Sequence, residues 1–288
     1  MKYGLLGEKL SHSFSAEIHK CLGGYDYELI EVGKKDLDLF LKRRDFSAVN
    51  VTIPYKQDVI PYLYYISDTA KSVGAVNTVV NRDGKLYGYN TDFLGMRALI
   101  LKNGIDLKDK KVLIAGSGGT SKTALAVAKE LGAREIYRLS RSPEGGLISY
   151  GQAEKLHSDA DVIINTTPAG MYPKIAGAAL DINKFPRLCG VIDAVYNPLR
   201  SELVQKALDK GIPAEGGLYM LVAQAAKAAE LFFDDLSMTE KTEAVFQRIL
   251  WQKQNIVLIG MPGSGKSTLG RRIADLTGKA FYDSDALI

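Results

Sequence analysis

The sequence predicts an α/β protein with more than one domain, and three features support this. Strand-like apolar runs alternate with helical patterns along most of its 288 residues. One run, residues 112–115, is followed at once by the glycine-rich turn 116–119 and then by a helical pattern. Because this run lacks polar alternation, it is typical of a strand buried on both faces. Finally, the length of the chain suggests about two domains.

The strand, glycine turn and helix together predict the opening of a Rossmann dinucleotide-binding unit. Gly116 would allow the tight turn, and Gly118 would let a pyrophosphate approach the backbone at the helix N-terminus. Ser121 stands where the fingerprint prefers Gly or Ala. Since the required strand and helix flank the turn, cofactor binding is favoured over a purely structural turn.

The strand after this helix indicates the type of cofactor. Residues 135–142 end without the acidic residue that would bind the ribose 2′-hydroxyl of NAD, and they offer Arg141 between Ser140 and Ser142. A guanidinium flanked by hydroxyls suits a 2′-phosphate, so NADP is favoured over NAD. The alternative is that Arg141 is an ordinary solvated arginine.

Composition excludes several classes of protein. The hydrophobic share of 46% and net charge of +4 are ordinary, and the basic residues are scattered among acidic ones, unlike a nucleic-acid surface. Cys21 and Cys189 have no metal-type spacing, and both are expected to be reduced core residues. No apolar stretch is long enough for a signal peptide or a membrane span. We therefore expect a cytoplasmic protein with no metal, membrane or nucleic-acid partner.

Three serines alternate near the N-terminus, at positions 11, 13 and 15, where a helix is expected to begin. Ser13 or Ser15 could cap that helix, and capping is favoured by sequence alone. The cluster also suits a hydroxylated or carboxylated small ligand.

A second polar group follows the strand that begins near residue 48. Asn50 and Thr52 are two positions apart and therefore share a face, and Pro54 ends the strand. Lys56 is expected to begin the next helix. Most lysines in such positions are solvated, which is the alternative for Lys56.

A hairpin is predicted from residues 72–80 and 86–90, with its turn at Asp83 and Gly84. It leads to residues 90–92, at the start of a helix closed by Gly104. Asp92 could cap that helix, could act in catalysis, or could do both. Beyond the dinucleotide unit, residues 161–168 and 190–196 are expected to be buried strands with polar ends at the carboxyl edge of the sheet, where ligands bind.

With these residues identified, residues 1 to about 250 resemble shikimate dehydrogenase. Eight ordered strings carry the resemblance, among them 11–15, 50–56, 90–92 and 115–119. The resemblance implies that Lys56 and Asp92 are the catalytic pair. It implies a substrate site and an NADP site. The substrate residues would be Ser13, Ser15, Asn50, Thr52, Asn77, Thr91, Tyr196 and Gln224. The NADP residues would be Gly116, Ser117, Gly118, Gly119, Thr120, Ser140, Arg141, Ser142, Thr166 and Gly217.

The resemblance also implies the domains and the reaction. A substrate domain, residues 1–92, would be completed by helices in 218–252, and a Rossmann domain would span 93–217. The implied reaction is the reversible NADPH-dependent reduction of 3-dehydroshikimate to shikimate, in the shikimate pathway of aromatic amino acid biosynthesis. A quinate/shikimate dehydrogenase of broader specificity and a non-catalytic ligand-binding regulator are the alternatives. Sequence leaves open whether Lys56 is a true general base or mainly positions and stabilises the reacting oxygen.

The C-terminal residues carry a separate motif. Residues 255–267 form an apolar strand pattern followed by a P-loop string with Gly260, Gly265, Lys266 and Ser267 at the required spacing. Residues 253–288 resemble the first segment of shikimate kinase, and we expect an incomplete module without kinase activity. Its exposed strand would be disordered, would dock on the body of the protein, or would pair with another copy, so a homodimer is one expectation.

Overall fold

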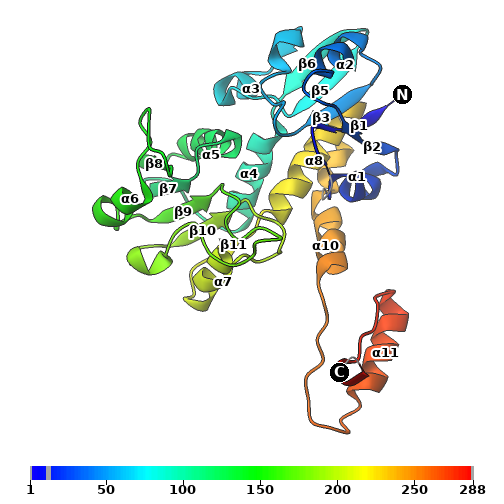
Figure 1. Cartoon of the computed structure of the whole chain (residues 1–288), viewed down its shortest axis with the longest axis vertical. Coiled ribbons are helices and arrows are strands. Elements are labelled where there is room, and N and C mark those ends of the chain that lie inside the picture. Colours follow the sequence, from blue (N-terminus) through cyan, green and yellow to red (C-terminus); the bar gives the residue numbers. More distant parts are fainter. Residues whose placement is uncertain (1, 11–13, 287–288) are drawn as a thin grey trace. The chain divides into compact units, whose positions relative to one another are not determined.

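The computed structural model describes residues 2–10 and 14–286. The chain divides into two compact units, Met1–Leu250 and Trp251–Ile288, and the larger one contains two β-sheets (Figure 1). Apolar strands and amphipathic helices therefore produce the α/β class that the sequence predicts.

The first sheet is mixed and has the strand order β2-β1-β3-β5-β6-β4. Strands β1, β2 and β3 are parallel, whereas β5 runs antiparallel to β3 and β6. Asn50 on β3 pairs with Thr78 on β5, which sets two polar side chains beside each other. The strands are β1 Tyr3–Gly7, β2 Tyr27–Glu31, β3 Ala48–Val51, β4 Tyr65–Ile66, β5 Thr78–Arg82 and β6 Lys85–Tyr89. The helices are α1 Ser15–Gly23, α2 Leu37–Arg43 and α3 Asp68–Val73, with a 3₁₀ turn at Ile60–Tyr62.

The second sheet is parallel throughout and has the order β11-β10-β9-β7-β8. All five residues of β7 are buried, as the absence of polar alternation predicted. Buried apolar clusters cover both faces of the sheet, as a doubly wound fold requires. The strands are β7 Lys111–Ala115, β8 Glu135–Leu139, β9 Val162–Asn165, β10 Gly190–Asp193 and β11 Ala214–Glu215. The helices are α5 Gly119–Glu130, α6 Tyr150–Leu156 and α7 Glu202–Asp209, with a 3₁₀ turn at Ile182–Lys184.

Two helices, α4 (Thr91–Lys102) and α8 (Leu218–Phe233), lie between the two sheets and pack closely (Figure 1). Gly95 permits that approach, because a Cβ there would lie 2.6 Å from the Met220 carbonyl oxygen of α8. Helix α8 also packs on α1, and buried residues of α10 (Thr242–Lys253) join the same cluster. A short helix, α9 (Ser237–Glu240), connects α8 with α10.

Several boundaries differ from the predictions. Ser72 and Val73 belong to α3, which ends at Gly74 in the left-handed region, so the first strand of the hairpin begins only at Thr78. The hairpin turn itself is confirmed, since Asp83 and Gly84 both have positive φ.

No α-helix begins at Lys56, which instead lies in a run of turns after β3. Cys189 was predicted in the core and is exposed, and Cys21 is half-buried. Both cysteines are free.

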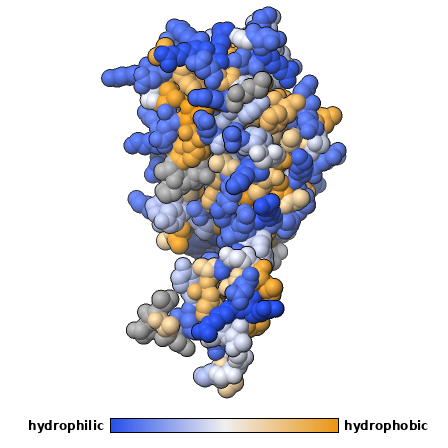
Figure 2. All heavy atoms as spheres, turned by 90° about the vertical axis from the view of Figure 1, so that its right-hand side faces the viewer, coloured by the Kyte–Doolittle hydropathy of each residue, from blue (hydrophilic) through white to orange (hydrophobic). Residues whose placement is uncertain are grey.

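In the second unit, helix α11 (Lys266–Thr277) follows the glycine-rich loop, and a 3₁₀ turn occupies Ser284–Ala286. The strand predicted before the loop is absent from the described residues: 254–261 have no regular structure, and Val257 and Ile259 are 76% and 92% exposed. Among the described residues no strand pairs with this apolar run, and a single unpaired strand is not stable. Hydrophobic and hydrophilic atoms are interspersed on the visible face of this unit (Figure 2).

Candidate functional site

A cavity of about 260 Å³ lies in the larger unit, between residues of the first sheet, the glycine turn of the second sheet and helix α8. It receives residues far apart in sequence because α4 and α8 hold the two sheets side by side. Its polar lining includes many residues predicted for the site: Ser15, Asn50, Thr52, Lys56, Asn77, Asp92, Gly119, Thr120, Tyr196, Gly217 and Gln224.

Lys56 and Asp92 form an ion pair in this cavity, with Lys56 Nζ 2.5 Å from Asp92 Oδ2. The side chains are only 23% and 9% exposed, so the pair is shielded from water. Asp92 does not cap α4, which corrects one prediction, because Asn90 Oδ1 accepts the Phe93 N–H at 3.1 Å. The Asp92 carboxylate, in the first turn of the helix, therefore pairs with Lys56.

Asn77 ties three elements together beneath the cavity. Its Oδ1 accepts the backbone N–H of Thr91 at 2.7 Å, and its Nδ2 donates to Thr91 Oγ1 at 3.1 Å. Nδ2 also lies 3.4 Å from Gln224 Oε1 of α8. Residues 147 positions apart thus share one hydrogen-bonded cluster, which orders the wall of the cavity.

Three predicted substrate residues need comment. Thr91 is almost fully buried behind Asn77 and is not among the cavity-lining residues, so its contribution is to position Asn77 and the start of α4. Ser15 is the first residue of α1, and the N-cap residue is Phe14, so the prediction that Ser15 caps this helix is wrong. Ser13 lies outside the described residues.

His19 is a cavity residue that sequence reasoning missed. It is 1% exposed, stacks on Tyr27 at 3.8 Å between ring centroids, and hydrogen-bonds Tyr25 Oη. Burial lowers its pKa to about 3, so the ring is neutral at ordinary pH. A single histidine among apolar helix positions gives no sequence signal beyond that of a core residue.

The carboxyl edge of the second sheet carries the predicted cofactor residues around β7. Strand order reverses there, with β8 on one side and β9 on the other, which is where dinucleotides bind in open α/β sheets. Gly116 has φ +117, and a Cβ on it would lie 2.5 Å from Thr166 Oγ1, so only glycine fits. A Cβ on Gly118 or Gly119 would meet nothing within 4 Å, which leaves open space before the N-terminus of α5. The turn therefore fits a pyrophosphate approaching the backbone.

Ser140 to Ser142 form a turn just after β8. Ser140 Oγ accepts the Ser142 backbone N–H at 3.1 Å, and the Arg141 side chain is exposed beside it. A ligand phosphate could reach this guanidinium from solvent. These three residues do not line the 260 Å³ cavity, nor do Gly116, Ser117, Gly118 and Thr166.

Asp193 anchors the loop that contributes Tyr196 to the cavity. It is fully buried at the end of β10, where its Oδ1 accepts from Asn165 Nδ2 at 2.8 Å and from the Val195 N–H at 3.0 Å. Burial raises the pKa of Asp193 despite these hydrogen bonds. Burial likewise raises the pKa of Tyr196, so its hydroxyl stays protonated and can donate.

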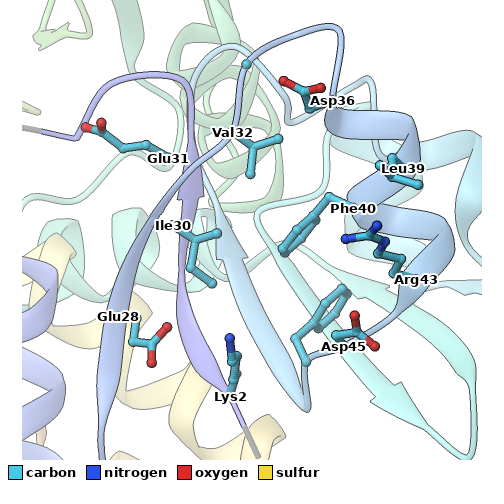
Figure 3. A pocket seen from close by; sticks show the side chains of 12 residues that line it. Lys2, Glu28, Ile30, Glu31, Val32, Asp36, Leu39, Phe40, Arg43 and Asp45 are labelled. Carbon is cyan, nitrogen blue, oxygen red and sulfur yellow. The ribbon is translucent and has the colours of Figure 1, made fainter.

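A second cavity, of about 410 Å³, lies over edge strand β2 and helix α2 (Figure 3). Its labelled charged side chains stand around an apolar floor that includes Ile30, Val32 and Phe40 (Figure 3). Lys2 and Arg43 stand among four carboxylates in its lining, so the charges are mixed. None of the predicted site residues lies there, and we assign it no function.

Within the described part of the chain, no group of three or more potential metal ligands comes together. The helices of that part include none with the length and apolar character needed to cross a bilayer.

Comparison with known proteins connects this geometry to a family. Residues 5–79 match the family described as the shikimate dehydrogenase substrate binding domain. A "Shikimate dehydrogenase (NADP(+))" from Clostridium beijerinckii is 37% identical over 265 residues, which cover 85% of this chain and 97% of that protein. The chain belongs to the shikimate dehydrogenase family.

Solved structures share the fold of this shikimate dehydrogenase family member. The Thermus thermophilus shikimate 5-dehydrogenase, in complex with NADP(H) and shikimate, superposes with a TM-score of 0.72 at 28% identity, covering 85% of this chain and 99% of that one. A quinate dehydrogenase from Corynebacterium glutamicum, in complex with NAD, gives 0.77 at 26% identity, covering 87% and 99%. The scaffold alone therefore does not distinguish the two substrates or the two cofactors.

Proposed function

We propose that this chain is an NADP-dependent shikimate dehydrogenase, which reversibly reduces 3-dehydroshikimate to shikimate in the shikimate pathway. The observation that carries the proposal is the shielded Lys56–Asp92 pair in a cavity that also contains Gly119 and Thr120 of the glycine turn. A proton-transfer pair and the start of a dinucleotide site thus border the same space.

NADPH, when bound, supplies the hydride that reduces the ketone carbon. Lys56 acts at the ketone oxygen, donating a proton from its ammonium group as negative charge develops there. In the reverse direction the neutral amine accepts the proton of the shikimate hydroxyl. Asp92 holds Lys56 in place through the 2.5 Å hydrogen bond.

The neutral polar side chains of the cavity bind the hydroxyls and carboxylate of the substrate in this proposal. Asn50, Thr52, Asn77 and Gln224 offer amide and hydroxyl groups from β3, the loops beside it, and α8. The Tyr196 hydroxyl and Ser15 add further groups at the wall. Such groups give orientation without a second buried charge.

The cofactor would lie across the carboxyl edge of the second sheet. Backbone N–H groups of residues 116–120, at the N-terminus of α5, would hold the pyrophosphate. Arg141, with Ser140 and Ser142, would bind the 2′-phosphate. The open space over Gly118 and Gly119 supports this placement.

The alternatives predict different behaviour. A broader quinate/shikimate dehydrogenase would also reduce a nicotinamide cofactor with quinate. A non-catalytic regulator would bind shikimate without turnover, and the presence of both Lys56 and Asp92 speaks against it.

The test is absorbance at the nicotinamide band after purified protein is mixed with shikimate or quinate and with NADP⁺ or NAD⁺. We expect reduction of NADP⁺ with shikimate, and much slower reduction in the other three mixtures. Equal rates with quinate would support the broader enzyme. No reduction in any mixture, together with measurable shikimate binding, would support the regulator.

We further propose that the second unit binds a polyphosphate through residues 260–267, without kinase activity. The observation that favours this is that the P-loop lysine and serine both lie at the start of α11, directly after the glycine-rich loop. Lys266 Nζ donates to the carbonyl oxygens of Gly260 and Met261 at 2.9 and 2.8 Å, and Ser267 Oγ donates to Asp283 Oδ2 at 2.9 Å. In P-loops the lysine binds phosphate oxygens and the serine hydroxyl binds Mg²⁺. Because the described residues of this unit contain no sheet, we expect binding only.

The fluorescence of Trp251, the single tryptophan, can be used to follow binding to this unit, because Lys279 Nζ of the same unit lies 5.2 Å from its ring centre. Mg²⁺ and inorganic tripolyphosphate would be titrated into the full chain, with NADP⁺ saturating the dinucleotide site. Equilibrium dialysis of labelled tripolyphosphate would run in parallel. We expect saturable binding that Lys266→Ala weakens at least about 10-fold while dehydrogenase activity is unchanged. Absence of binding by dialysis, or equal binding by the variant, would overturn the proposal.

A further inference from the structure

We propose that Tyr27 and His19 position the Asn50 side chain so that its amide N–H, and not its carbonyl oxygen, binds a substrate hydroxyl. This inference rests on the proposed dehydrogenase function and adds to it the residues that set the orientation of one substrate-binding group. Tyr27 and His19 are positioning residues in this scheme, because they act through Asn50.

The Asn50 oxygen is already occupied. Tyr27 Oη donates to Asn50 Oδ1 at 2.8 Å, reaching from edge strand β2 across β1 to β3. The oxygen end of the amide therefore already has a donor, the Tyr27 hydroxyl.

The Tyr27 ring packs against His19, which in turn contacts Tyr25. The His19 and Tyr27 rings stack with an interplanar angle of 10°, and Tyr25 Oη hydrogen-bonds His19 Nδ1. Burial raises the pKa of Tyr27 well above its usual value, so its hydroxyl remains a donor.

The other end of the amide is then a donor by necessity. Asn50 Nδ2 lies 3.1 Å from Thr78 Oγ1 and a longer 3.4 Å from the Asn77 carbonyl oxygen. Because the second contact is long, this N–H is only weakly bonded within the protein, and it can be shared with a ligand oxygen in the cavity, which Asn50 lines. A flipped amide would place its carbonyl oxygen against the Asn77 carbonyl oxygen, which can only accept a hydrogen bond.

The partner that this arrangement selects is a hydroxyl oxygen. One neutral amide N–H matches a single hydroxyl oxygen of the ligand, whereas a carboxylate has two oxygens that each need donors. The Tyr27–His19 pair thus contributes to substrate recognition without contacting substrate through Tyr27.

A double-mutant cycle tests the proposal. Tyr27→Phe removes one oxygen and keeps the stacked ring, and Asn50→Ala removes the side chain on which it acts. We expect Tyr27→Phe to lower kcat/KM for shikimate about 10-fold in the wild-type background, mainly by raising KM, and by less than about 2-fold in the Asn50→Ala background. An equal loss of kcat/KM in the wild-type and Asn50→Ala backgrounds would show that the Tyr27 hydroxyl acts independently of Asn50, and it would overturn the proposal.

A matched control uses the same substitution elsewhere in this part of the fold. Tyr62 Oη donates to Asp38 at the surface, so Tyr62→Phe should leave kcat/KM unchanged. Melting temperatures of all variants would establish that each is folded at the assay temperature.

Analogues of shikimate, each lacking one ring hydroxyl, would identify the group recognised. The loss of kcat/KM caused by Tyr27→Phe should disappear for the analogue that lacks the hydroxyl bound by Asn50, and it should remain for the other analogues. Persistence with every analogue would contradict the hydroxyl assignment. If wild-type protein does not turn over shikimate, the proposed function is wrong, and this inference can still be tested separately. The double-mutant cycle would then use dissociation constants of shikimate, for which the same non-additivity is expected.

Discussion

Lys56 Nζ lies 2.5 Å from Asp92 Oδ2, although the two residues are 36 positions apart and belong to a loop and a helix. We expect Asp92→Asn to lower kcat about 10²–10³-fold, because a neutral amide binds the Lys56 ammonium group more weakly than a carboxylate does and positions it less precisely for proton transfer. Steady-state kinetics with shikimate and NADP⁺ would measure this. The same substitution in the exposed pair of Asp68 and Lys71 is the control and should change nothing. A near-normal kcat for Asp92→Asn would contradict the role of the pair.

Arg141 determines cofactor preference in this account. Arg141→Ala should lower kcat/KM for NADP⁺ by about 10–100-fold and leave that for NAD⁺ within about 2-fold, because only NADP⁺ carries the 2′-phosphate. Arg187, which pairs with Asp161 away from the glycine turn, supplies the control substitution Arg187→Ala. Equal losses with both cofactors would instead indicate a general effect on the Rossmann domain.

His19 makes the stability of the fold depend on pH. Its pKa is about 3 in the folded protein and about 6.5 when unfolded, so the unfolded state takes up a proton first as pH falls. Stability is therefore lost progressively from about pH 6.5 down toward 3, at up to about 1.4 kcal/mol per pH unit from this group.

Urea unfolding of wild type and His19→Gln between about pH 7.5 and 4.5 would check this dependence. The unfolding free energy of wild type should exceed that of His19→Gln at neutral pH, and this difference should become smaller as pH falls, because only wild type loses the His19 contribution. Protonation of carboxylates affects both proteins alike. His157→Gln should narrow the difference in the same direction, because burial also lowers the pKa of His157, whose ring packs on Tyr137 in the other sheet. Parallel curves for wild type and His19→Gln would show that His19 is not held neutral.

Ser121 is fully buried, and its Oγ has no hydrogen-bond partner among the described residues. Ser121→Ala should therefore leave stability unchanged or raise it by about 1 kcal/mol, because it removes a buried polar atom that lost its hydration on folding. Thermal unfolding would measure the change. Ser149→Ala should have the opposite sign and cost about 1 kcal/mol, since Ser149 forms a capping box with Gln152. A destabilised Ser121→Ala would imply that the hydroxyl has a role in the fold.

Local patterns predicted much of this fold. The buried strand β7, its glycine turn and the hairpin turn at Asp83 and Gly84 depend on neighbouring residues, and all three are present. The strand before the P-loop failed because a strand needs a partner, which residues 254–261 do not have among the described residues. Capping at Ser15 and Asp92 failed for a related reason: both lie inside their helices and not at the position that precedes them.

Residue patterns identified candidates for the site, but they did not show which candidates are in contact. The pairing of Lys56 with Asp92 was implied by the family resemblance alone, because their hydrogen bond depends on how α4 packs against the first sheet. Asn77 and Gln224 meet only because Gly95 lets α8 approach α4. His19 was missed because a buried neutral histidine resembles any other core residue in sequence.

The most direct test of the central claim compares wild type with Lys56→Ala, measuring both turnover of shikimate with NADP⁺ and the dissociation constant of shikimate. If Lys56 transfers the proton, kcat should fall at least about 10²-fold while the dissociation constant changes less than about 3-fold. A variant with near-normal kcat would remove Lys56 from the mechanism and contradict the account.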